Sequence, residues 1–249
     1  MRGPPGTGVD PRAAERFHPP VRLQAILFDY GGTLDGPASH WLDRFVDLYA
    51  AAGRAVPFDA LRTAFYRADE AAYGDARVAD MSLAQLMEFH VAVQLRQLDI
   101  DDARLHRHLV EAFVAGSEAA LADSRARLSR LAAERYRLGV VSNFYGNVAR
   151  ILADAGIAPL LAVVADSNRV GVMKPDRRIF EHALAGLETP AAATLHVGDS
   201  YERDVCAANA IGLRTAWLVP AARRAESRHP APDLIISSLD ELLARLEEK

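Results

Sequence analysis

The feature that most constrains the fold is a regular alternation of short apolar runs with helical segments in the second half of the chain. After about residue 125, five runs of six or seven residues are separated by segments with apolar residues at helical spacing. The runs are RLGVVSN (137–143), LAVVADS (161–167), TLHVGDS (194–200), RTAWLV (214–219) and DLIISS (233–238). This alternation predicts crossover units that build an open parallel sheet, a Rossmann-like α/β fold.

A further apolar run stands far from the others, at residues 23–28, and stops at Asp29. Between it and the second run, residues 41–121 carry apolar residues at helical spacing, broken by turn residues. This stretch predicts roughly four helices and no strand. The first run therefore belongs to the sheet, and an all-helical segment is inserted directly after it.

These patterns predict three parts of the chain. Residues 21–35 and 125–249 are expected to form the α/β core domain, and residues 36–124 the helical cap domain. Residues 1–20 are rich in Gly, Pro and Arg and lack the apolar segment of a secretory signal, so a flexible leader is expected there.

Composition narrows the range of partners. The 249 residues carry a net charge of -4, so no basic excess favours a nucleic acid or an anionic membrane. The single cysteine, Cys206, cannot form an internal disulfide, which suits a reducing compartment. No apolar run has the length that a bilayer span needs. A cytoplasmic protein without nucleic-acid or membrane partners is expected.

Polar residues directly follow several of the predicted strands. They are Asp29 after the first, Ser142 and Asn143 after the second, Lys174 a short loop beyond the third, and Asp199 with Asp204 after the fourth. Ligands of open parallel sheets bind at the carboxyl ends of the strands, so these side chains should converge. Carboxylates brought together repel one another unless a cation lies between them, and oxygen ligands suit Mg²⁺. A cation beside a lysine and a hydroxyl is a site for a phosphate group.

Four motifs carry a resemblance to a known family. They are FDYGGTLDG, VVSNFYG, GVMKPDRRIF and HVGDSYERDV, which begin at residues 28, 140, 171 and 196. In this order the chain resembles the haloacid dehalogenase-like (HAD) hydrolase superfamily, in its group with a helical cap between the first two motifs. The resemblance covers the chain from about residue 23 to its end.

The resemblance implies a mechanism and a metal site. Asp29 would attack phosphorus and form an aspartyl-phosphate that water then hydrolyses. Asp29, the backbone carbonyl of Gly31 and Asp199 would hold Mg²⁺. Asp204 would be a further ligand or would contact one of the ligands. Lys174 would neutralise charge on Asp29 and on the phosphoryl group.

Three further residues are expected at the phosphate. By the same resemblance, Ser142 would donate a hydrogen bond to a phosphoryl oxygen. Asn143 is a candidate contact, with a role in a turn as the open alternative. Gly31 and Gly32 would permit positive φ and a close approach of backbone N–H groups to the anion, with Gly32 as the candidate phosphate contact, whereas on a purely structural interpretation the two glycines only form a tight turn.

The chain departs from the family's phosphatases at Gly31. Their second aspartate, which stands at this position, protonates the leaving oxygen and later activates water. A backbone carbonyl survives the change, but the general acid and base does not, and positioned proton transfer is worth about 10² to 10⁴ in rate. His40, Tyr30 and Tyr145 lie near the motif loops, but none is singled out as a substitute.

Three functions are compatible with these residues. The preferred one is a Mg²⁺-dependent phosphatase that acts on a small phosphorylated metabolite. A second is a non-catalytic HAD-like scaffold that binds a phosphorylated ligand or a protein, which the absence of a carboxylate at Gly31 would permit. A third is a dehalogenase-like enzyme in which Asp29 forms an ester with carbon, since halide leaves without a proton. Asp199 favours phosphate chemistry; the choice of substrate and the oligomeric state do not follow from the sequence.

Overall fold

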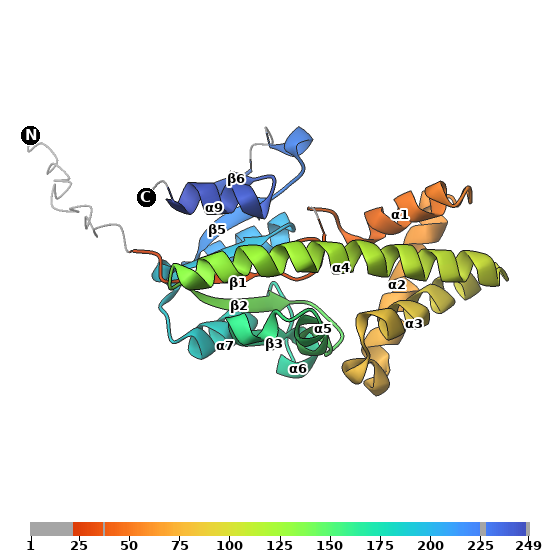
Figure 1. Ribbon diagram of the computed structural model, residues 1–249, viewed down its shortest axis with the longest axis horizontal. Coiled ribbons are helices and arrows are strands. Elements are labelled where there is room, and N and C mark those ends of the chain that lie inside the picture. Colours follow the sequence, from red (N-terminus) through yellow and green to blue (C-terminus); the bar gives the residue numbers. More distant parts are fainter. Residues whose placement is uncertain (1–21, 37, 225–227, 248–249) are drawn as a thin grey trace, which may run out of the picture.

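The sheet contains six parallel strands, and each coincides with one of the apolar runs. The computed structural model describes residues 22–36, 38–224 and 228–247, so the predicted leader, 1–20, lies outside the described residues. The strands are β1 (Ala25–Phe28), β2 (Arg137–Ser142), β3 (Leu161–Asp166), β4 (Thr194–Gly198), β5 (Arg214–Leu218) and β6 (Leu234–Ile236). Their order is β3-β2-β1-β4-β5-β6, which confirms the predicted Rossmann-like α/β fold (Figure 1).

The position of β1 decides where the polar residues emerge. All four residues of β1 are buried, and Phe28 lies between Val140 of β2 and Val197 of β4. From β1 the chain first adds β2 and β3 on one side and then β4, β5 and β6 on the other side. The change of direction creates a switch point at the carboxyl edge of the sheet. Asp29, Ser142 and Asp199 therefore leave the sheet next to one another.

Helices cover both faces of the sheet. Ile26 and Phe28 pack on one face with α4, α5 and α9, whereas Ala25 and Leu27 pack on the other face with α7 and α8. This alternation along β1 is what a strand buried on both faces requires. The helices on these faces and the short turns between them are α4 (Ala103–Ala133), α5 (Val148–Asp154), α6 (Ser167–Val170), α7 (Arg177–Leu187), the π-helical turn Tyr201–Cys206, α8 (Ala207–Asn209) and α9 (Leu239–Glu247).

Between β1 and β2 lies a helical segment with four α-helices, as the spacing of apolar residues predicts. They are α1 (Trp41–Ala51), α2 (Phe58–Gly74), α3 (Leu83–Gln97) and α4, with a short 3₁₀ turn at Ala76–Asp80. One of them, α4, is 31 residues long and runs through the predicted boundary at residue 124. Its last turns, with Leu128 and Leu131, join the core of the sheet, so one continuous helix belongs to both parts of the molecule (Figure 1).

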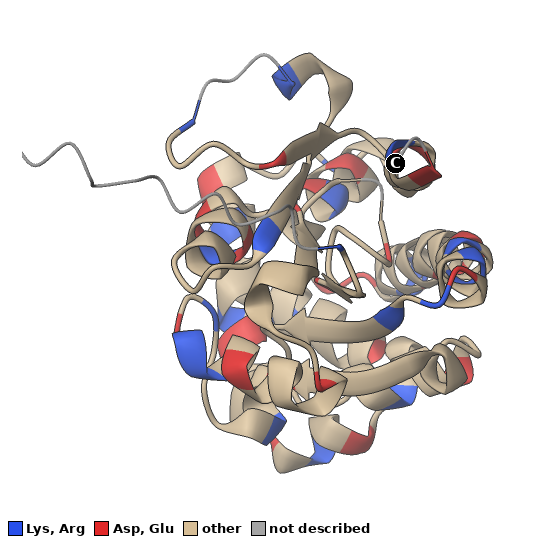
Figure 2. Ribbon diagram, turned by 90° about the vertical axis from the view of Figure 1, so that its left-hand side faces the viewer, with Lys and Arg blue, Asp and Glu red and all other residues tan. Residues whose placement is uncertain are grey.

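The outer surface is mixed in charge. On the end of the molecule turned toward the viewer in Figure 2, acidic and basic residues are interspersed. That end presents no extended field of one sign. Within the described part of the chain, none of the helices combines the length and apolar character of a bilayer span.

A buried carboxylate ties the loop after β1 to the helical segment. Asp35 is fully buried and accepts hydrogen bonds from the backbone N–H of Gly32 at 2.8 Å, from Trp41 Nε1 at 2.6 Å and from Arg44 Nη1 at 3.1 Å. Arg44 also donates to Ser117 Oγ of α4 at 2.7 Å. Burial raises the pKa of Asp35, and the charge of Arg44 opposes that rise. This cluster joins the loop, α1 and α4, and sequence patterns did not single it out.

Replacement of Asp35 should unfold the protein more readily. Asp35→Ala leaves the guanidinium of Arg44 and two N–H donors without their buried acceptor, so we expect a loss of about 3 to 5 kcal/mol in the free energy of unfolding. Urea denaturation measures it. Asp123→Ala, which removes an exposed i,i+4 ion pair with Arg127, is the control and should change stability by less than about 0.5 kcal/mol. Equal effects of the two substitutions would contradict the role of Asp35.

Candidate active site

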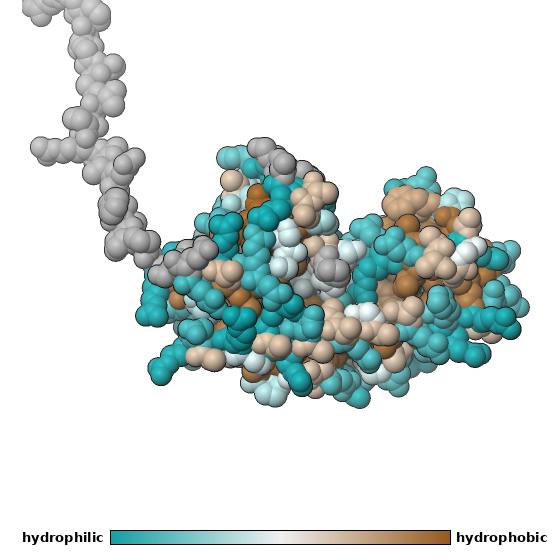
Figure 3. All heavy atoms as spheres, turned by 45° about the horizontal axis from the view of Figure 1, so that its top comes forward, coloured by the Kyte–Doolittle hydropathy of each residue, from teal (hydrophilic) through white to brown (hydrophobic). Residues whose placement is uncertain are grey.

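A cavity opens at the carboxyl edge of the sheet, between the sheet and the helical segment. Its volume is about 240 Å³, which suits a small metabolite. Figure 3 shows that the face of the molecule is hollowed between these two parts. The sheet side of the wall includes Asp29, Gly31, Ser142, Asn143, Phe144, Tyr145, Met173, Lys174, Asp199, Ser200, Arg203 and Asp204; the helical side includes His40, Trp41, Phe65, Asp69 and Tyr73.

Lys174 lies between two carboxylates at the base of this cavity. Its Nζ is 2.8 Å from Asp29 Oδ1 and 2.6 Å from Asp204 Oδ1. The side chains of Lys174 and Asp204 are almost fully buried, and that of Asp29 is 11% exposed. Burial alone would lower the pKa of Lys174, but the charges of Asp204 and Asp29 outweigh it and raise the pKa. The lysine therefore stays charged next to Asp29.

Asp204 is held from several sides. In addition to Lys174, it accepts hydrogen bonds from His196 Nε2 at 3.0 Å and from the backbone N–H of Ser200 at 2.9 Å. These partners hold the pKa of Asp204 well below its usual range, because the charge of Lys174 and the bond from His196 overcome the effect of burial. A Cβ on Gly198 would lie 2.3 Å from Asp204 Cγ, so only glycine at the end of β4 leaves room for this carboxylate. Asp204 anchors Lys174.

Asp199 lies close to Asp29 and Asp204 at the carboxyl edge of the sheet. One oxygen each from Asp29, Asp199 and Asp204 lie within 4.8 Å of one another. Burial first, and then the charges of Asp29 and Asp204, raise the pKa of Asp199 well above its usual value. The backbone carbonyl of Asp199 accepts a hydrogen bond from Trp217 Nε1 at 3.0 Å, which fixes its loop. A divalent cation would relieve the repulsion, and three carboxylates at this spacing fit an oxygen-liganded ion such as Mg²⁺.

The two glycines of the first motif differ in their roles. Gly32 has φ of +74°, and a Cβ there would lie 2.5 Å from Asp199 Oδ2. Its N–H donates to Asp35 Oδ1 at 2.8 Å, and the absence of a Cβ leaves room for the carboxylate of Asp199. Gly31 has no positive φ, and a Cβ there would make only ordinary contacts with Trp41, the nearest at 3.8 Å. The expected need for positive φ therefore holds at Gly32 alone.

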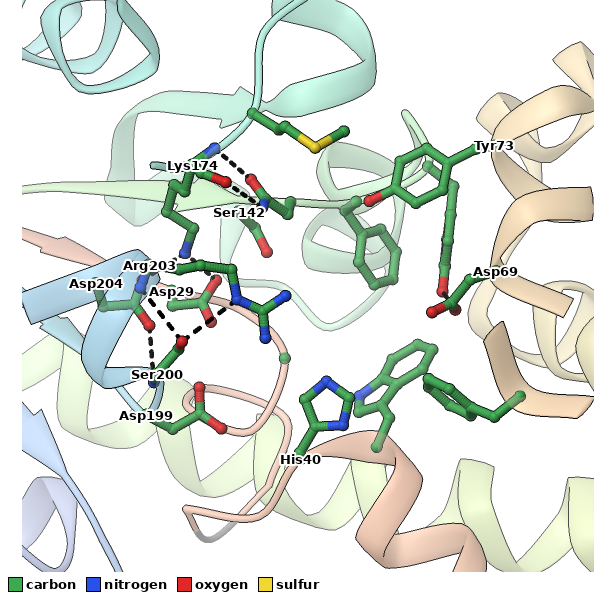
Figure 4. Close-up of a pocket in the computed structure, with 17 residues that line it drawn as sticks. Asp29, His40, Asp69, Tyr73, Ser142, Lys174, Asp199, Ser200, Arg203 and Asp204 are labelled. Carbon is green, nitrogen blue, oxygen red and sulfur yellow. Dashed lines mark hydrogen bonds and ion pairs between the residues drawn. The ribbon is translucent and has the colours of Figure 1, made fainter. Parts of the chain in front are cut away.

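Ser142, the last residue of β2, and Asn143, which follows it, have different surroundings. Ser142 is buried at the end of β2, and Figure 4 shows its side chain on the cavity side near Asp29 and Lys174. Asn143 Oδ1 accepts from the backbone N–H of Lys174 at 2.7 Å, and its Nδ2 donates to the Lys174 carbonyl at 2.9 Å. Both ends of the Asn143 amide are used to position Lys174. The open alternative, a structural role in the loop, describes Asn143 better than a phosphate contact.

His40 is fixed as a hydrogen-bond donor. Its Nδ1 accepts from the backbone N–H of Leu42 at 3.2 Å at the start of α1, which leaves the ring proton on Nε2. Burial, and then the charge of Arg203, lower the pKa of His40. A neutral imidazole with its free nitrogen already protonated cannot accept the proton of an attacking water. His40 is thus a poor substitute for the missing base.

The comparison with protein families decides the classification. Residues 23–212 match the model of the haloacid dehalogenase-like hydrolases. The chain belongs to this family. Haloacid dehalogenase-like hydrolase domain-containing protein 3 of Danio rerio is 34% identical over 125 residues, which are 50% of this chain and 52% of the relative. Phosphoserine phosphatase of Thermus thermophilus is 35% identical over 91 residues, 36% of each chain.

The match to curated relatives is partial in length. This HAD-like hydrolase spans about half the length of the first of them, and less of the second. A solved structure titled as a dehalogenase with an intermediate complex has a TM-score of 0.61 at 19% identity and covers 90% of this chain and 97% of that chain. At that identity the likeness shows the fold alone.

A side chain at position 198 should disrupt the anchor of Lys174. Gly198→Ala forces Asp204 away from Lys174, His196 and Ser200, so we expect a loss of about 2 to 4 kcal/mol in the free energy of unfolding. Gly74→Ala, at the end of α2 with open space around its Cβ position, is the matched control and should be neutral or slightly stabilising. Chemical denaturation of both variants is the measurement, and a neutral Gly198→Ala would refute the argument.

Proposed function

We propose that this HAD-like hydrolase is a Mg²⁺-dependent phosphatase that acts on a small phosphorylated metabolite through Asp29. The observation that carries the proposal is the carboxylate of Asp29 at the cavity base, 2.8 Å from a buried lysine and beside the second acidic residue Asp199. A nucleophile, a fixed cation and a pair of metal-binding carboxylates are what phosphoryl transfer requires. The name of the Thermus thermophilus relative, phosphoserine phosphatase, agrees with this choice.

Three groups are proposed to hold the magnesium ion. They are the carboxylates of Asp29 and Asp199 and the backbone carbonyl of Gly31, which lines the cavity beside them. Asp204 is the weaker candidate, because Lys174, His196 and Ser200 already donate to its two oxygens. When bound, the ion supplies positive charge that offsets the repulsion between Asp29 and the phosphate.

The reaction proceeds in two displacements at phosphorus. A carboxylate oxygen of Asp29 bonds to phosphorus as the bond to the leaving oxygen breaks, and that oxygen keeps the electron pair. Water then attacks the aspartyl-phosphate, loses a proton to solvent and releases inorganic phosphate with the free Asp29 carboxylate. Lys174 balances the negative charge in both steps, and the hydroxyl of Ser142 donates to a phosphoryl oxygen.

The leaving oxygen has to find its proton elsewhere than at residue 31. Gly31 has no carboxyl group, and the neighbouring Trp41 N–H is already donated to Asp35 at 2.6 Å. Water or the substrate itself therefore supplies the proton in this proposal. Esters whose leaving group is stable without a proton should react faster than simple alkyl phosphates.

The other two functions have less support. A carbon–halogen hydrolase has no use for Asp199 beside Asp29, where burial and repulsion make the metal-free pair unfavourable. A binding scaffold has no use for a carboxylate held against a buried lysine at the base of a cavity. The phosphatase uses all of these groups.

Removal of the nucleophile should abolish turnover. Asp29→Asn keeps the size of the side chain but removes the attacking carboxylate, so kcat for p-nitrophenyl phosphate should fall by at least about 10³-fold. Release of nitrophenol with Mg²⁺, and with the metal removed by a chelator, is the measurement. The exposed Asp123→Asn is the control and should keep full activity. Activity retained in Asp29→Asn would rule out the covalent route.

Restoring the missing carboxyl group should favour poor leaving groups. Gly31→Asp places an acid where the backbone permits a side chain, and kcat/KM for an alkyl phosphate should rise by about 10- to 10³-fold. The rate with p-nitrophenyl phosphate, whose leaving group needs no proton, should change much less. Gly31→Asn, of the same size but without an acidic proton, is the control. An equal gain with Gly31→Asn, or no gain with Gly31→Asp, would count against the proposed role of this position.

A further inference from the structure

We propose that Asp69 of α2 forms a second binding subsite in this cavity, which takes a protonated amino group on the part of the substrate that leaves the phosphate. The inference rests on the proposed function and extends it to a substrate class, the phosphate monoesters of short amino alcohols. Asp69 lines the cavity, and its side chain is 22% exposed. Figure 4 shows it across the cavity from Asp29, Asp199 and Lys174.

The carboxylate of Asp69 is held by a buried polar chain. His90 Nε2 lies 3.1 Å from Asp69 Oδ1, and Gln94 Nε2 lies 2.8 Å from His90 Nδ1. The amide of Gln94 donates to Nδ1, so His90 carries its proton on Nε2 and donates it to Asp69. Both His90 and Gln94 are fully buried within the helical segment. Polar groups in a helical core cost free energy unless they are hydrogen-bonded. Among the described residues Gln94 Oε1 has no partner, and the remaining bonds of His90 and Gln94 orient one carboxylate that faces the cavity.

A second donor reaches Asp69 from the sheet side of the cavity. The hydroxyl of Tyr145, in the loop after β2, donates to the same oxygen, Oδ1. Burial, and then the charge of Asp69, raise the pKa of Tyr145 well above its usual value, so the phenol keeps its proton. Two donors therefore orient Oδ1. No residue in the described part of the chain donates to Oδ2, and this oxygen is left for a ligand.

The walls around Asp69 favour a small cation over a second anion. The aromatic rings of Phe65, Tyr73, Trp41 and Phe144 line the same cavity. Aromatic faces attract ammonium groups, and a fixed carboxylate repels phosphate and carboxylate groups. Lys174 and Arg203 are the basic residues that also line the cavity; Arg203 Nε donates to Ser200 Oγ at 3.3 Å, and its charge acts on Asp199, His40 and Tyr73. Both residues extend from the sheet side of the cavity, whereas Asp69 lies on α2 across from them (Figure 4).

The size of the cavity limits what can connect the two ends. The whole cavity, from the phosphate site to Asp69, has a volume of about 240 Å³, so a phosphate and a chain of a few atoms fill it. An amino group at the end of such a chain makes a charge-assisted hydrogen bond with Oδ2. A negatively charged substituent at the same end of the chain would be repelled by the carboxylate of Asp69.

The test compares two phosphonates of the same shape that the enzyme cannot hydrolyse. 2-Aminoethylphosphonate and n-propylphosphonate differ only by an ammonium in place of a methyl group. Titration calorimetry of the full chain with Mg²⁺ should show about 10- to 100-fold tighter binding of the amino compound. Asp69→Asn keeps the shape of the side chain and should abolish this preference, while the affinity for n-propylphosphonate stays within about 3-fold. Glu70→Gln, an exposed neighbour on α2, should keep the preference.

Each outcome bears on the subsite separately from the phosphatase. Equal binding of the two phosphonates by the wild type, binding of neither, or an equal loss of both in Asp69→Asn would overturn the subsite. In these cases turnover of p-nitrophenyl phosphate would leave the phosphatase intact. A preference that depends on Asp69, in a protein that hydrolyses no phosphate ester, would support the subsite and reject the proposed function.

Discussion

The site depends on one buried interaction, the ammonium of Lys174 between the carboxylates of Asp29 and Asp204. None of these three charges is stable alone at that depth, because burial penalises each ionised group. Together they are held by His196, by the backbone of Ser200 and by the amide of Asn143. The attractions between these charges offset the free-energy cost of burying them. The carboxylate of Asp29 thereby lies at the base of the cavity.

The second constraint is the link between the sheet and the helical segment. Asp35 joins the loop after β1 to α1, and Arg44 carries the connection to α4, the helix that belongs to both parts. The hydroxyl of Tyr145 makes a further link, to Asp69 of α2. The two walls of the cavity are therefore joined by hydrogen bonds between buried or half-buried groups. The position of the helical wall, which faces the leaving group in the proposed reaction, is set by these contacts.

The sheet and its polar edge follow closely from the sequence, while the helical wall does not. Strands buried on both faces leave apolar runs that are easy to recognise, and the residues directly after parallel strands must meet at one edge. Asp29, Ser142 and Asp199 could be placed in this way. Asp69 and His90 lie in helices where charged residues usually face solvent, and only the packing of α2 against α3 decides that His90 is buried.

Local geometry accounts for the other differences. An asparagine after a strand can contact a ligand or form hydrogen bonds within a loop. At Asn143 both ends of the side-chain amide bond the backbone of Lys174, which favours the role in the loop. Gly32 and Gly31 look alike in the sequence, but only Gly32 has positive φ, and only there would a Cβ collide with Asp199. The boundary at residue 124 was predicted from the change in the spacing of apolar residues along the chain. The helix α4 continues through this residue, so the backbone has no break there.

The central claim is that Asp29, Lys174 and Asp199 together form a phosphoryl-transfer site. A crystal structure of the protein grown with Mg²⁺ and beryllium fluoride, a mimic of the phosphoryl group, tests it most directly. We expect the fluoride complex on a carboxylate oxygen of Asp29, with the Lys174 ammonium against it and one magnesium ion between Asp29 and Asp199. An ion bound elsewhere, or an unmodified Asp29 turned away from Asp199, would contradict the account.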